Sequence, residues 1–201
     1  MIDTRLRHRI QPLIERAGKN LHQAGFTPFQ ITLAALITGL IAGFFISRHW
    51  MVMALVFLWL SGILDMLDGT VARLSDRVSP TGALMDLILD RMVEAAVILG
   101  FYSIAPEHAL AHLLFLIGVI FNFSTFLAAG ALLPNKGGKS MHYDPGILER
   151  TETFLLFTVM ILWPAGRFGL LMAFNLLMFV TGILRLYRLI QQEQTAVKHD
   201  E

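Results

Sequence analysis

The stretch that decides the fold is DMLDGTVARLSDRVSPTGALMDLILD, residues 65–90. It places charged side chains next to long apolar runs: Asp65, Asp68, Asp86, Asp90, Arg73 and Arg77. An acid within or at the edge of a membrane is costly, so its default interpretation is functional. The rest of the chain is therefore interpreted around this stretch.

The spacing of these residues predicts two polar helix faces. In a helix over 65–73, one face carries Asp65, Asp68, Gly69, Ala72 and Arg73. In a helix over 82–90, another face carries Gly82, Asp86 and Asp90. The intervening LSDRVSPTG contains a proline and turn-forming residues, so the chain is expected to reverse there. The two acidic faces can then meet across an antiparallel pair.

Converging carboxylates repel one another unless cations bind, and oxygen ligands suit hard divalent cations. The small residues beside the acids leave room for a ligand against the backbone. Two alternatives remain open from the residues alone. The acids could be structural charges at helix ends or in ion pairs. They could instead line an ion or proton pathway in a transporter.

Composition indicates a one-domain membrane protein. The 201 residues are 55% hydrophobic and 15% charged, with a mean hydropathy of +0.62, whereas soluble domains carry about 25% charged residues. There is no cysteine, so no disulfide framework exists. The opening MIDTRLRHRI lacks a cleavable apolar run, and no signal peptide is expected.

The hydropathy pattern predicts an all-α integral membrane fold: a six-transmembrane-helix bundle with an N-terminal amphipathic interfacial helix. The expected divisions are a juxtamembrane helix over 1–26, a membrane domain over 27–192 and a polar tail over 193–201. Thr27 is the expected N-cap of the first span, with Pro28 at its first position. The six spans are expected near 28–46, 51–73, 82–104, 109–133, 147–164 and 168–190.

The basic residues predict the orientation. One side would carry the arginines of the N-terminal helix together with Arg73, Arg77, Lys136, Lys139, Arg150, Arg185, Arg188 and Lys198. The other side keeps only Arg48 and Arg167. The positive-inside rule then puts both termini and the acidic site in the cytoplasm, with the protein in the cell inner membrane. Asn122-Phe-Ser124 matches a glycosylation acceptor but falls inside a predicted span, so it is set aside.

The stretch has the form D-x2-D-G-x2-A-R-x8-G-x3-D-x3-D, with all eight fixed positions filled. It resembles the signature of the CDP-alcohol phosphotransferase family (CDP-alcohol phosphatidyltransferases) of integral membrane enzymes. The segment from Gly146 to Arg150 is similar to the corresponding stretch of the phosphatidylinositol-phosphate synthase branch. One departure from many relatives is Phe29, where they have asparagine after the Thr-Pro pair.

The resemblance implies phosphatidyl transfer from a CDP-linked lipid, typically CDP-diacylglycerol, to an alcohol hydroxyl, with release of CMP. It implies two divalent cations, Mg²⁺ or Mn²⁺, on Asp65, Asp68 and Asp86, with Asp90 sharing in metal binding and acting as the general base. The expected CDP-binding set is Asp65, Asp68, Gly69, Ala72, Arg73, Arg77 and Gly82.

The acceptor is predicted from the basic residues expected on the same side of the membrane as the aspartates. Lys136, Lys139, Arg150 and Arg185 would attract a phosphorylated alcohol such as inositol phosphate or glycerol 3-phosphate. The alternative interpretation of each is an ordinary positive-inside residue, and an unphosphorylated acceptor such as serine, inositol or choline stays open. The resemblance also implies a homodimer in the bilayer, and no nucleic-acid partner is expected.

Overall fold

The computed structural model describes residues 2–132 and 150–197. Over these residues the chain is helical, with short connections. The α-helices are α1 (Ile2–Gln23), α2 (Pro28–Ser47), α3 (Met51–Leu74), α4 (Pro80–Ile104), α5 (Ala109–Leu132), α6 (Arg150–Leu162) and α7 (Arg167–Val197). Two short 3₁₀ helices, η1 (Pro106–His108) and η2 (Pro164–Gly166), precede α5 and α7. Each predicted span therefore contains a helix, and α7 continues into the predicted polar tail.

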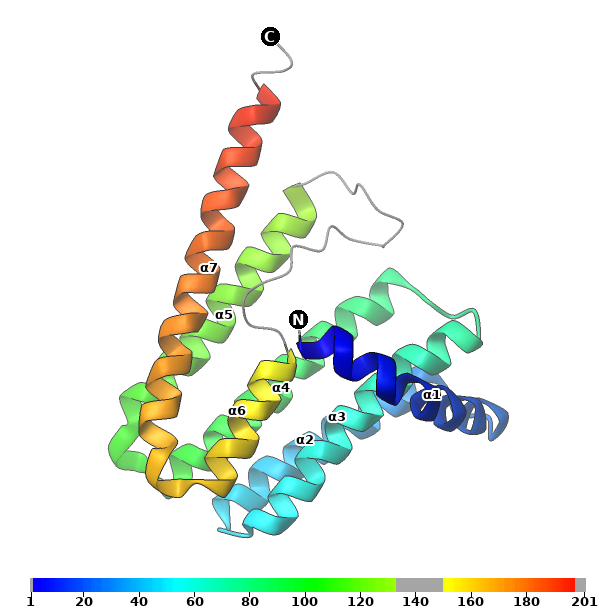
Figure 1. Ribbon diagram of the computed structural model, residues 1–201, viewed down its shortest axis with the longest axis horizontal. Coiled ribbons are helices and arrows are strands. Elements are labelled where there is room, and N and C mark those ends of the chain that lie inside the picture. Colours follow the sequence, from blue (N-terminus) through cyan, green and yellow to red (C-terminus); the bar gives the residue numbers. More distant parts are fainter. Residues whose placement is uncertain (1, 133–149, 198–201) are drawn as a thin grey trace.

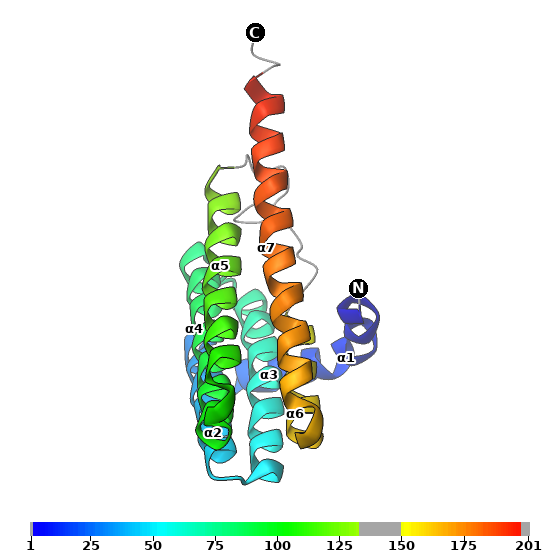
Figure 2. The ribbon, with the colours of Figure 1, turned by 90° about the vertical axis from the view of Figure 1, so that its left-hand side faces the viewer.

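Helices α2 to α7 form a bundle in which successive helices alternate in direction, and α1 lies crosswise beside it (Figures 1 and 2). We call the end where α3 finishes and α4 begins the site end. The C-termini of α5 and α7 lie at this same end (Figure 1). The opposite end, which holds the α2–α3 turn, η1 and η2, is the far end.

The helices have the length and apolarity of a membrane protein. Among the described residues, four segments are long and apolar enough to cross a bilayer: Pro28–Ser47, Met51–Leu74, Pro106–Ala131 and Pro164–Gln191. Helix α4 has 25 residues but carries four charged ones, and α6 has only 13 residues. The chain is thus an all-α integral membrane protein.

Local sequence signals fix where the helices begin. Thr27 caps α2 as predicted: its hydroxyl accepts from the backbone N–H of Gln30, and the Gln30 side chain accepts from the N–H of Thr27. Helix α4 begins two residues before the predicted position. Ser79 is its N-cap and accepts from the N–H of Gly82, while Pro80 takes the first helical position.

Helix α2 is the centre of the packing, because it contacts both α3 and α4 extensively. Its Gly39 faces Val93 of α4, and Gly43 lies against the backbone of Ala96. Gly100 of α4 in turn meets the backbone of Gly43. Small residues four apart let helix backbones approach closely in a membrane. The hydroxyl of Ser61 on α3 completes the arrangement by donating to the carbonyl of Ala35, at 2.7 Å.

Helix α1 is held at the site end by its apolar residues. Ile14, Ala17 and Leu21 pack against a buried cluster of Ile31, Leu67 and Val71. Gly18 is buried against α3, and exposed Arg16 and Lys19 follow other directions on α1. The second half of α1 therefore braces the part of α3 that carries Asp65 and Asp68.

Candidate metal centre

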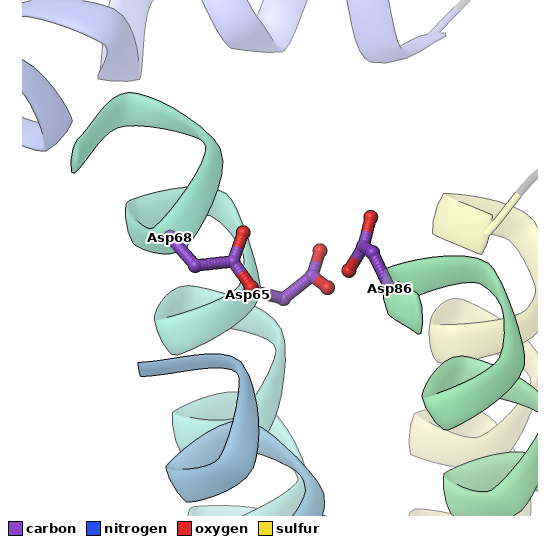
Figure 3. Close-up of side chains that lie close together, drawn as sticks. All are labelled: Asp65, Asp68 and Asp86. Atoms are coloured by element: carbon purple, nitrogen blue, oxygen red, sulfur yellow. The ribbon is translucent and has the colours of Figure 1, made fainter. Parts of the chain in front are cut away.

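Three of the four aspartates predicted to form the site come together in space. Asp65 and Asp68 lie one turn apart on α3, and Asp86 lies near the start of α4. One carboxylate oxygen from each residue can be chosen so that all three lie within 4.8 Å of one another. The three side chains point toward a common region between the helices (Figure 3). This confirms that the two acidic faces meet.

The donor set fits a hard divalent cation. All three groups are carboxylates, which are the ligands that Mg²⁺ and Mn²⁺ prefer. Asp68 is buried, with 6% of its surface exposed, while Asp65 and Asp86 are half-buried. Three like charges this close need a counter-charge, because their mutual repulsion grows where water is partly excluded. A bound divalent cation would supply that charge.

Asp90 lies one turn beyond Asp86 on α4 and is more deeply placed, with 9% exposure. It is not among the three carboxylates that cluster within 4.8 Å. Its predicted share in metal binding and its predicted role as general base stay predictions. Arg91, the next residue after Asp90, forms an ion pair at 2.9 Å with buried Glu94, which lies one turn beyond Asp90.

The small residues leave space beside the acids. A Cβ added to Gly69 would come no closer than 3.6 Å to a side chain, that of Arg73, and one on Gly82 would meet only the Ser79 hydroxyl at 3.1 Å. These glycines therefore differ from Gly43 and Gly100, which are filled by neighbouring helices. The openness agrees with the predicted room for a ligand. Ala72 is half-buried on the same helix.

The two arginines of the stretch are both exposed, at the site end. Arg73 is oriented within α3, because its Nη2 donates to the hydroxyl of buried Thr70 at 3.0 Å. Arg77 lies in the connection to α4. Each is within the part of the chain that carries the acids, so an anionic ligand held there would face positive charge.

The structure describes the four predicted acceptor-binding residues to different extents. Lys136 and Lys139 lie outside the described residues, and Arg150 begins α6, although its side chain is also outside them. Arg185 is buried on α7, with 6% exposure. Its Nη1 donates to the carbonyl of Asn122 at 3.0 Å, and its guanidinium lies 5.5 Å from the centre of the Phe126 ring.

Sequence reasoning missed the residues that support the site. Thr70 accepts a hydrogen bond from Arg73 and is in close contact with Gly18. Ser79 is the N-cap of α4. Ser79 before Pro80 is a recognisable capping signal. Thr70 and Asn122 give no comparable signal, because a polar residue in an apolar helix does not reveal which neighbour it will contact.

The fold and the site define a class: an all-helical integral membrane protein with a carboxylate cluster suited to divalent metal. The model of the family described as CDP-alcohol phosphatidyltransferase matches residues 26–190. The chain therefore belongs to the CDP-alcohol phosphatidyltransferase family and is an enzyme of that class. The divalent-metal dependence of the family agrees with the three clustered carboxylates.

Two relatives match nearly the full chain. It is 35% identical over 195 residues to the inner membrane protein YnjF of Escherichia coli, covering 93% of this chain and 94% of that protein. It is 27% identical over 184 residues to the archaetidylinositol phosphate synthase of Pyrococcus horikoshii, covering 92% and 94%. The first relative's name agrees with placement in a membrane.

Solved structures of one enzyme share the fold. The phosphatidylinositol phosphate synthase of Mycobacterium tuberculosis with CDP-DAG bound superposes with a TM-score of 0.76 at 20% identity, covering 89% of this chain and 94% of that one. Its complex with manganese and citrate gives a TM-score of 0.75 at 19% identity, covering 88% of each chain. At these identities the likeness establishes the fold.

Proposed function

We propose that the protein transfers the phosphatidyl group of CDP-diacylglycerol to the hydroxyl of a phosphorylated alcohol and releases CMP. The hydroxyl oxygen forms a bond to the phosphorus that carries the lipid, and the bond from that phosphorus to the CMP oxygen breaks. The observation that carries the proposal is the convergence of Asp65, Asp68 and Asp86 within 4.8 Å. Phosphoryl transfer depends chiefly on positioning and on charge neutralisation, which such a cluster can organise around metal.

Each residue of the site has a proposed role. Asp65, Asp68 and Asp86 would hold two divalent cations, Mg²⁺ or Mn²⁺, with Asp90 contributing. When bound, the cations would neutralise charge on the diphosphate oxygens. Asp90, one turn deeper on α4, would accept the proton of the attacking hydroxyl. The supporting observation for Asp90 is its burial immediately beside the cluster.

The donor would be recognised by the open face of α3 and the start of α4. Gly69, Ala72 and Gly82 would admit the cytidine, because little fills the space at the two glycines. Arg73 and Arg77 would offset the charge of the diphosphate. Arg73 is the better placed of the two, since Thr70 already fixes its direction.

The phosphorylated acceptor is supported by charge and by the names of relatives. An acceptor phosphate approaching clustered carboxylates would be repelled without nearby cations. Lys136, Lys139, Arg150 and Arg185 would supply them. Two relatives have names that agree with an inositol phosphate acceptor. One is the archaetidylinositol phosphate synthase, and the other is the phosphatidylinositol phosphate synthase of Mycobacteroides abscessus, which is 25% identical over 176 residues.

The proposed membrane arrangement has α2 to α7 crossing the bilayer as six spans. Helix α1 would lie in the interface, its exposed Arg16 and Lys19 toward anionic headgroups. The site end would face the cytoplasm, where the positive-inside rule puts the basic residues. We also propose a homodimer, as the family resemblance implies.

The reaction is tested with purified protein, radiolabelled CDP-diacylglycerol, Mg²⁺ or Mn²⁺, and a panel of alcohols. We expect metal-dependent CMP release with inositol phosphate or glycerol 3-phosphate. Preference for serine, inositol or choline would overturn the acceptor assignment alone. Absence of CMP release with every alcohol would contradict the proposed transfer reaction.

A variant at the start of α6 tests the acceptor phosphate. Arg150→Ala should raise the acceptor KM about ten- to a hundredfold, because a charge-assisted contact contributes about 1.5–3 kcal/mol. The KM for the CDP-lipid should stay near that of the wild type. Arg150→Lys should recover only part of the affinity, since a point charge does not reproduce the planar fork. An unchanged acceptor KM in Arg150→Ala would remove Arg150 from the acceptor site.

A further inference from the structure

Helices α5 and α7 are joined by the side chains of two asparagines, one from each helix. Asn122 of α5 donates from Nδ2 to the backbone carbonyl of Met178 on α7, at 2.6 Å. Asn175 of α7 donates from Nδ2 to the carbonyl of Ala111 on α5, at 2.9 Å. Both bonds cross between helices in an apolar bundle, where a side-chain amide has few other partners. Together they fix the axial register of α7 against α5.

Close packing makes that register specific near Asn122. Gly182 of α7 lies against the ring of Phe121. On α5, a Cβ added to Gly118 would lie 3.1 Å from the sulfur of Met178. The two glycines let side chains of the opposite helix settle against the backbone. A slide or rotation of α7 would lose both fits and the Asn122 bond together.

The same turn of α5 orients Arg185. The carbonyl of Asn122 accepts from Arg185 Nη1 at 3.0 Å, and the Phe126 ring lies 5.5 Å from the guanidinium carbon. The hydroxyl of Thr125 also donates to that carbonyl, at 2.9 Å. A hydrogen bond to one edge and a ring against the guanidinium restrict its plane as well as its position. Arg185 is buried in the site-end half of α7.

We infer that Asn122 and Phe126 are positioning residues that set Arg185 for the acceptor phosphate. This inference rests on the proposed function, in which Arg185 binds that phosphate. A guanidinium has five N–H donors in a fixed fork. In Arg185, Nη1 donates to the backbone carbonyl oxygen of Asn122. Bidentate phosphate binding requires the fork to point correctly, so a small misplacement lowers affinity strongly.

The two asparagines provide a matched pair of variants. Asn122→Ala and Asn175→Ala each remove one interhelical amide–carbonyl bond, but only Asn122 lies in the turn that holds Arg185. Asn122→Ala keeps the backbone carbonyl that accepts from Arg185 but loses the side-chain bond to Met178 that holds this turn of α5 against α7. We therefore expect the acceptor KM to rise about three- to tenfold, through displacement of that carbonyl and of Arg185. Asn175→Ala should leave the acceptor KM within about twofold. Neither variant should change the KM for CDP-diacylglycerol.

A double-variant cycle separates positioning from general destabilisation. Arg185→Ala should raise the acceptor KM about ten- to a hundredfold. If Asn122 acts through Arg185, adding Asn122→Ala to Arg185→Ala should raise the acceptor KM no further. Phe126→Leu, which keeps apolar volume but removes the ring, should raise the acceptor KM about two- to fivefold. This second variant keeps the test available if Asn122→Ala does not fold.

The outcomes distinguish the inference from the function beneath it. Equal acceptor KM values for the Asn122 and Asn175 variants, with Arg185→Ala strongly impaired, would overturn the positioning role alone. An additive effect in the double variant would do the same. An unchanged acceptor KM in Arg185→Ala would overturn both the inference and the proposed use of Arg185. If the wild-type protein releases no CMP with any alcohol, both the proposed transfer reaction and this inference are wrong.

Discussion

Gly18 of α1 lies directly against Thr70 of α3: a Cβ added to Gly18 would come within 2.7 Å of the Thr70 Cγ2. Thr70 is buried, and its hydroxyl accepts from Arg73. Asp68 lies two residues before Thr70 on the same helix. The crosswise helix α1 is thus in steric contact with the turn of α3 that follows Asp65 and Asp68 and holds Arg73.

This contact predicts that Gly18→Ala destabilises the protein by about 1–3 kcal/mol, the usual cost of overpacking. Turnover should fall as well, because a displaced Thr70 no longer fixes Arg73. Thr70→Ser keeps the hydroxyl but removes Cγ2, so it should restore much of the loss in the double variant. Thermal unfolding in detergent and CMP release measure the two effects.

A second glycine provides the control for that experiment. Gly169 of α7 has nothing within 4 Å of an added Cβ. Gly169→Ala should therefore leave stability unchanged or raise it slightly, since alanine favours helix. Equal losses of stability in Gly18→Ala and Gly169→Ala would show that Gly18 is not in close contact with Thr70 in the active protein.

The carboxylate cluster predicts a loss of metal binding on removal of one charge. Asp68→Asn and Asp86→Asn keep the side-chain shape but remove an anionic ligand. Turnover should fall by more than the roughly 10–100-fold that follows loss of an outer-shell partner. Mn²⁺ binding, followed by paramagnetic resonance of the free ion, should weaken in parallel.

The control for the cluster is Asp76, in the connection between α3 and α4. It is exposed and has a φ of 51°, a left-handed conformation that both aspartate and asparagine tolerate. Asp76→Asn should therefore retain stability, metal binding and turnover. Mn²⁺ affinity at the wild-type level in Asp68→Asn and Asp86→Asn would contradict the proposed metal centre.

The crossing of α2 and α4 predicts a difference between two neighbouring glycines. Gly43→Ala brings a methyl group against the backbone of Ala96, which no side-chain change can relieve. Gly39→Ala meets side chains alone, chiefly the two methyl groups of Val93 and, at 3.0 Å, the hydroxyl oxygen of Ser61, so Val93→Ala should rescue most of the loss. We expect each single variant to lose about 1–3 kcal/mol of unfolding free energy. Rescue of Gly43→Ala by Val93→Ala would contradict this packing.

The orientation can be tested on the natural chain, which has no cysteine. Val78 is exposed at the site end, and Glu107 is exposed at the far end. With the site end in the cytoplasm, Glu107→Cys should react with an impermeant thiol reagent in intact cells, and Val78→Cys only after lysis. The reverse pattern would place the metal centre on the opposite side.

The sequence by itself determined the helices and the composition of the site. Runs of apolar residues of spanning length, the Thr27-Pro28 cap and the break around Pro80 each act locally, so they could be located without coordinates. The spacing of Asp65, Asp68 and Asp86 also placed them on helix faces able to meet. The family signature added the chemistry, because its fixed positions all fall in this one stretch.

The tertiary structure decided how those faces meet and what supports them. The relative position of α3 and α4 depends on α2, which packs against both and meets α4 backbone to backbone at Gly43. Periodicity also could not show that Asp90 lies outside the three-carboxylate cluster, or that Arg185 is buried against Asn122. These features depend on the depth and rotation of one helix against another. Such quantities are set by the sum of many non-local contacts, whereas a sequence pattern records only neighbours along one helix.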